Sequence, residues 1–92
     1  MAYRTMADSP TMLRRLLAAC TESMLTGQPL HREHTRTYCT VAIAGQVTRV
    51  EREDGSGSRY NVYTDDGTCY FCEGGDYCGM VRTVKTPAPA RR

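Results

Sequence analysis

The sequence predicts a single α+β domain rich in β-structure, in which an N-terminal helix is followed by a small antiparallel sheet. Three observations lead to this class. An apolar stripe recurs at helical spacing near the N-terminus, and the pattern changes to a period of two from about residue 39 onward. The chain has 92 residues, which suffices for one domain only. Its net charge of +2 is too small to indicate nucleic-acid binding by itself.

A helix is predicted over residues 10–26. Ser9 suits the N-cap, Pro10 suits the first helical position, and Gly27 followed by Pro29 ends the helix. Five side chains form one apolar stripe, which is expected to pack on the sheet or in the groove of a partner protein. These side chains are Leu13, Leu16, Leu17, Cys20 and Met24.

Alternation of apolar and polar residues predicts the strands, after a polar connector over residues 31–37. Gly45 interrupts the first strand, where we expect a bulge or a bend. The strands are expected at about residues 39–53, 59–64, 69–72 and 79–84. The domain then spans residues 10–85, between a flexible leader at 1–9 and a disordered tail at 86–92.

Several classes of protein are not expected. No run of 18 apolar residues is present, which argues against a membrane-spanning helix. The first ten residues lack an apolar stretch, so a secretory signal is not expected. The five cysteines therefore suggest reduced thiols in an intracellular protein. An enzyme is not expected, because no nucleophile–base pattern and no glycine-rich phosphate loop before a helix is found.

Residues 41–68 carry a resemblance to a known family. The matching positions are Val41, Ile43, Gly45, Val47, Val50, Glu51, Tyr60, Val62, Asp65, Asp66, Gly67 and Thr68. This segment resembles the beginning of an OB-fold domain, as in the middle subunit of replication protein A and related telomere-complex subunits. The resemblance implies an OB-like sheet or partial barrel, binding of single-stranded nucleic acid in a genome-maintenance assembly, and a nuclear location.

Too few residues follow Cys39 for the five strands of a complete OB barrel. We therefore expect a partial barrel that a protein partner or a second copy of the chain completes. A sheet edge left uncovered would favour such pairing.

The second predicted strand has two different faces. Tyr60, Val62 and Thr64 share the face expected to join the core. The opposite face carries a cation, an amide and an aromatic ring, which suit phosphate contacts and base stacking. The expected nucleic-acid-binding residues are Arg59, Asn61, Tyr63, Arg49, Arg52 and Tyr70.

The cysteines make zinc a candidate cofactor. Cys69 and Cys72 form a C-x2-C pair, which on a turn supplies two ligands of a tetrahedral site. Cys78 is the candidate third ligand, and Cys39 the fourth. A C-x2-C pair inside a regular strand would instead point its thiols to opposite faces, so free thiols and redox use remain alternatives. His31 and His34 are further candidate ligands, although exposed side chains in a polar connector are the favoured interpretation.

The residues leave three functions open. The first is a small OB-like accessory subunit that binds single-stranded nucleic acid. The second is a protein-interaction subunit without nucleic-acid binding of its own. The third is a small β-domain that zinc stabilises.

Overall fold

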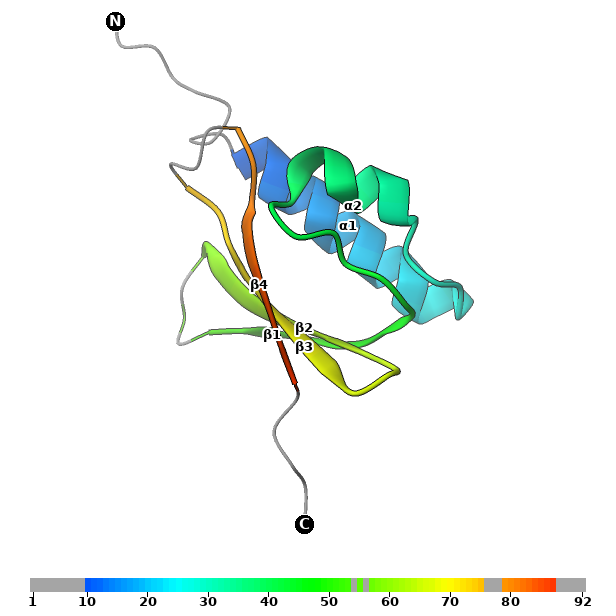
Figure 1. Ribbon diagram of the computed structural model, residues 1–92. Helices are drawn as coiled ribbons and strands as arrows, with labels where there is room; N and C mark the ends of the chain where they lie inside the picture. Colours follow the sequence, from blue (N-terminus) through cyan, green and yellow to red (C-terminus); the bar gives the residue numbers. More distant parts are fainter. Residues whose placement is uncertain (1–9, 54, 56, 76–78, 88–92) are drawn as a thin grey trace, which may run out of the picture.

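The computed structural model describes residues 10–53, 55, 57–75 and 79–87. Both of its helices lie on one face of a four-stranded antiparallel sheet with strand order β1-β2-β3-β4 (Figure 1). The predicted class, a β-rich α+β domain with an N-terminal helix before an antiparallel sheet, is confirmed. The elements are α1 (Pro10–Thr26), α2 (Arg32–Tyr38), β1 (Val47–Arg52), β2 (Arg59–Thr64), β3 (Thr68–Glu73) and β4 (Arg82–Pro87).

The segment predicted as a polar connector is largely helical, because α2 occupies residues 32–38. Thr35 and Tyr38, three residues apart on α2, are both buried. The Cys39 amide donates a hydrogen bond of 2.7 Å to the Thr35 carbonyl and extends the helical bonding. A buried threonine and a tyrosine make a weak apolar stripe, which is why the pattern did not predict this helix.

The first strand begins at Val47, much later than the expected residue 39. Gly45 adopts a φ of +101°, and a Cβ there would come within 3.2 Å of Asp65 Oδ1. The predicted interruption at Gly45 therefore precedes the strand, because a left-handed residue with a close neighbour cannot continue it. Cys39 forms only an isolated parallel bridge with Val81.

The C-terminal strands are displaced from their expected bounds. β3 runs over residues 68–73, one residue longer at each end than expected. β4 begins at Arg82 and reaches Pro87, so Thr86 belongs to a strand and not to the expected tail. The expected leader at 1–9 and the remaining tail at 88–92 lie outside the described residues.

The core lies between the two helices and the inner face of the sheet. Its buried members are Leu13, Leu16, Cys20, Leu30, Tyr38, Cys39, Ile43, Val47, Val62, Tyr70, Cys72 and Val81. Most of the predicted stripe of α1 packs here, with Leu17 partly buried at its margin. Only Met24 of that stripe, 38% exposed, remains available to a partner protein. The apolar stripe of α1 thus packs on the chain's own sheet and not in the groove of a partner protein, the other possibility that the sequence left open.

The sheet is open. In the described part of the chain, β1 pairs along its length only with β2, and β4 only with β3. This arrangement is consistent with a partial barrel. Neither described helix has the length and apolar character needed to cross a membrane.

Two buried hydroxyl groups fix the helices to the segment that leads into the sheet. Ser23 Oγ on α1 accepts a hydrogen bond from the Val47 amide (2.9 Å) and donates one to the Gln28 carbonyl (2.7 Å). Thr35 Oγ1 on α2 accepts one from the Ile43 amide (3.0 Å). Both residues are almost fully buried, and their bonds satisfy the backbone amides of the fully buried Val47 and Ile43.

Replacing Ser23 with alanine should lower the free energy of unfolding by about 1–3 kcal/mol, because the buried Val47 amide would lose its acceptor. Urea unfolding followed by circular dichroism measures this change. Thr21→Ala is the matched control, since the exposed Thr21 hydroxyl bonds only to Leu17 within its own helix. Equal losses in the two variants would contradict the anchoring role of Ser23.

Candidate nucleic-acid interface

The face of the sheet opposite the helices, called the open face here, carries side chains from all four strands. Cross-strand partners in an antiparallel sheet share a face, so the pairing register assigns its members. They are Arg49, Glu51, Arg59, Asn61, Tyr63, Cys69, Phe71, Glu73, Arg82, Val84 and Thr86. The predicted alternation of the second strand is confirmed, since Val62 and Thr64 are buried on the inner face.

Two aromatic rings lie diagonally on the central strands of this face. Asn61 pairs with Phe71 and Tyr63 pairs with Cys69, which places Tyr63 and Phe71 one diagonal step apart. Such diagonal neighbours lie about 7–8 Å apart. Both rings are partly exposed, and Val84, 37% exposed, lies opposite Phe71 on β4. The open face thus has an aromatic and aliphatic centre.

Tyr70, an expected stacking residue, is only 1% exposed and lies on the inner face. Its phenol oxygen accepts a hydrogen bond of 3.4 Å from the Ala44 amide. Phe71, one position along the strand, faces outward instead. The expectation was wrong by one residue, and one residue exchanges the two faces of a strand. The register of β3 is the signal that identifies Phe71.

Two side chains, Arg49 and Glu51, hold Tyr63 in place. The Arg49 guanidinium lies 4.8 Å from the centre of the Tyr63 ring and forms a 2.7 Å ion pair with Glu51. The Tyr63 hydroxyl donates a hydrogen bond of 2.9 Å to Glu51, which raises the pKa of that hydroxyl. These contacts orient the ring before any ligand arrives.

The remaining expected cations divide between the two faces. Arg59 is exposed at the start of β2 on the open face. Arg52 pairs with Tyr60, which packs against the core, so Arg52 stands on the helix side and does not join the expected set. Arg82, which the sequence did not single out, joins the open face and forms a 3.3 Å ion pair with Glu73.

The C-x2-C pair lies inside β3, and its two thiols point to opposite faces. The Cys69 thiol donates a 3.9 Å contact to Asn61 Oδ1 on the open face, whereas Cys72 is buried in the core. A single ion cannot bind both thiols in this arrangement. Cys78 lies outside the described residues, and within those described no three potential ligands gather around a metal position. Cys69 and Cys72 are therefore not joint ligands of one ion in this structure, and zinc as a cofactor stays a prediction.

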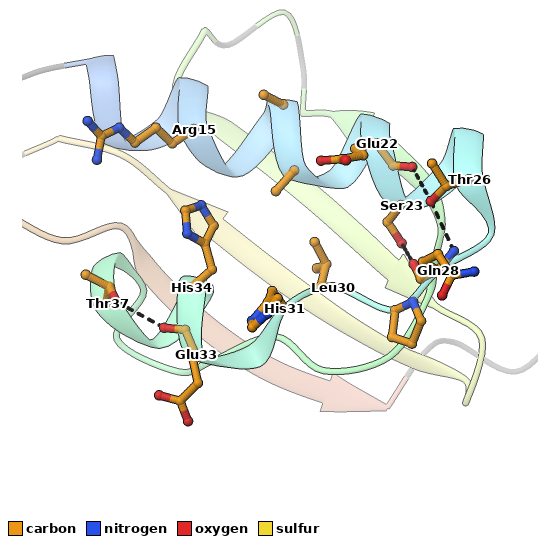
Figure 2. A pocket seen from close by; sticks show the side chains of 13 residues that line it. Arg15, Glu22, Ser23, Thr26, Gln28, Leu30, His31, Glu33, His34 and Thr37 are labelled. Carbon is orange, nitrogen blue, oxygen red and sulfur yellow. Dashed lines mark hydrogen bonds between the residues drawn. The ribbon is translucent and has the colours of Figure 1, made fainter.

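The helix side carries a groove of about 900 Å³ between α1 and α2 (Figure 2). His31 and His34 line it, together with Arg15 and Glu22 from α1. His34 points from α2 toward α1, and the centres of the His34 and Tyr38 rings lie 4.9 Å apart with the ring planes perpendicular. Both histidines are exposed, as the simpler interpretation expected. None of the expected nucleic-acid-binding residues lines this groove.

No family model matches the sequence, and no significant match exists among curated proteins or solved structures. The OB-fold resemblance of residues 41–68 stays a prediction.

The free energy of unfolding should fall as the pH rises from about 9 to about 11. Burial raises the pKa of Cys39 from 9.0 to about 11 and that of Cys20 to about 12, and it shifts Cys72 in the same direction. Above pH 9 the unfolded chain releases these protons while the folded chain retains them, so rising pH favours unfolding. Below pH 9 the thiols are protonated in both states and contribute no pH dependence.

Urea titrations at several pH values measure this slope. The Cys39→Ala variant is the control, because it lacks one of the titrating thiols and should show a shallower decline, whatever its stability at neutral pH. A stability profile that stays flat through pH 11 would contradict the burial of these groups as thiols.

Proposed function

We propose that the open face binds single-stranded nucleic acid by stacking bases on Tyr63 and Phe71. The observation that carries this proposal is the diagonal placement of two rings on the central strands of a sheet whose other face is covered by helices. Four-stranded sheets that present aromatic rings in this way stack two or three unpaired bases. Each stacked base contributes about 1–3 kcal/mol, with little dependence on its identity.

The groups around the rings support contacts to the rest of a nucleotide. Along the open face of β2, Asn61 lies between Arg59 and Tyr63. From this position its side-chain amide would face the bases of a bound strand. Arg49 and Arg82 also stand on this face, but each is ion-paired with a carboxylate. Phosphates would compete with Glu51 and Glu73 for these cations, so we infer modest affinity and a shallow dependence on salt.

A protein partner is the second candidate, and the same ion pairs favour it. An apolar centre of Phe71 and Val84 with a charge-balanced border resembles the core and rim of a protein interface. An accessory subunit of a genome-maintenance assembly would use the face in this way. Neither candidate requires catalytic chemistry of this chain.

Replacing either ring with leucine should weaken nucleic-acid binding by a factor of about 5–150, the equivalent of one lost stacking contact. Fluorescence anisotropy of a labelled single-stranded oligonucleotide at low salt measures the affinities of Tyr63→Leu and Phe71→Leu. Tyr63→Phe keeps the ring and should retain most of the binding.

Leu25→Ala is the matched control, because Leu25 is an 81% exposed apolar residue on α1, away from the open face. Absence of binding at tens of micromolar protein would overturn the nucleic-acid proposal and favour the protein partner. Unchanged affinity in both leucine variants would overturn the assignment of the open face.

Arg59→Gln should lower the affinity and reduce the slope of log affinity against log salt by about 1, as expected for one phosphate contact. The same titration with Arg32→Gln tests specificity, since Arg32 is an exposed arginine on α2. An equal change in slope for both variants would show that the response reflects net charge and not the open face.

A further inference from the structure

The two edges of the sheet differ in how their backbone groups are satisfied. On β4, Thr40 Oγ1 accepts a hydrogen bond from the Thr83 amide (2.8 Å) and lies within bonding distance of the Thr83 carbonyl (3.2 Å). The Val81 amide donates to the carbonyl of Tyr38 at the end of α2, and the Val81 carbonyl accepts from the Thr40 amide. Beyond Thr83, the outward positions are Lys85, a charged residue, and Pro87, which has no amide. The β4 edge is therefore protected against pairing.

The β1 edge is protected only at its beginning, where the Val47 amide bonds to Ser23 Oγ. The Glu53 amide donates to the Arg59 carbonyl (3.0 Å), which identifies these two as a hydrogen-bonded pair. By the alternation of an antiparallel ladder, Glu51 also bonds toward β2, whereas the backbone groups of Val50 and Arg52 point away from it. No described residue forms a backbone hydrogen bond with those outward groups of Val50 and Arg52.

We propose that the β1 edge pairs antiparallel with the β1 edge of a second copy of the chain, with Val50 opposite Val50 of that copy. A two-fold axis makes two copies of the same edge antiparallel and places one residue opposite its own counterpart. The outward amide and carbonyl of Val50 then form two hydrogen bonds with those of the second copy. The two sheets become one eight-stranded sheet with a continuous open face.

The charges on β1 select this register. With Val50 at the centre, Arg49 lies opposite Glu51 of the second copy, and the pair occurs twice. A centre at Glu51 would place two glutamates opposite each other. A centre at Arg52 would place Glu51 opposite Glu53 and Arg52 opposite itself. Of these three registers, only the one centred at Val50 places opposite charges across from each other without also placing like charges across from each other.

The short edge makes this a weak dimer. A few strand residues bury much less surface than a standard interface, and the ion pairs are exposed to salt. We expect a dissociation constant of about 0.1–1 mM. Sedimentation of the full chain, without nucleic acid, should therefore show the mass rising from monomer to dimer as the concentration increases through this range. Higher salt should shift the rise to higher concentration.

Val50→Pro removes an outward amide that the chain itself does not use, and proline is tolerated at such edge positions. We expect this variant to stay monomeric at 1 mM, a concentration at the upper end of the expected range. Lys85→Pro is the matched control, because it removes an outward amide from the β4 edge and should dimerise like the unaltered chain. Circular dichroism verifies that both variants fold.

Amide hydrogen exchange tests the same pairing without any substitution. Exchange at Val50 should slow as the protein concentration rises, whereas exchange at Lys85 should stay constant. A charge swap, Arg49→Glu with Glu51→Arg, should retain dimerisation, and Glu51→Arg alone should weaken it. A monomer at every concentration, or protection at Lys85 in place of Val50, would overturn the proposal. Neither result depends on whether the open face binds nucleic acid.

Discussion

Burial of one face of the sheet beneath both helices is the constraint on which the rest of the structure depends. Val47, Val62 and Tyr70 face Leu16 and Cys20 across a single core. The described chain has helices on one face only, so no helix covers the other face. An open face with a pre-oriented ring, and a sheet with two edges, both follow from this one-sided core. The candidate interfaces therefore lie where the helices do not reach.

The same core explains the role of three of the cysteines. Cys20, Cys39 and Cys72 fill it as small apolar side chains, and burial keeps their thiols protonated. A buried thiol with a raised pKa is a poor nucleophile, because nucleophilic attack requires the thiolate. A high cysteine count in this chain thus reflects packing needs in a thin two-layer domain for at least these three residues.

Strong local signals account for what the sequence predicted correctly. Helix 10–26 combines a long apolar stripe with clear end signals, and strand 59–64 alternates between hairpin turns. The short helix α2 has only two buried residues, Thr35 and Tyr38. Two such residues do not form an apolar stripe, so the sequence pattern could not distinguish this helix from a polar connector. On the open face, Tyr63 followed from alternation within one strand. Phe71 did not, because its face depends on the register between strands, which only the folded sheet determines.

The two proposed interactions, nucleic-acid binding by the open face and dimerisation through the β1 edge, are both weak, and each would strengthen the other. A second copy paired through β1 extends the open face, so one strand of nucleic acid can contact both copies. In this proposed assembly the second contact is intramolecular and benefits from a high effective concentration, which would offset the modest affinity proposed for one face alone. By linkage, whatever free energy dimerisation adds to binding, binding adds to dimerisation. Two marginal interactions, one of rings and one of backbone, can thus support a single assembly that neither would hold alone.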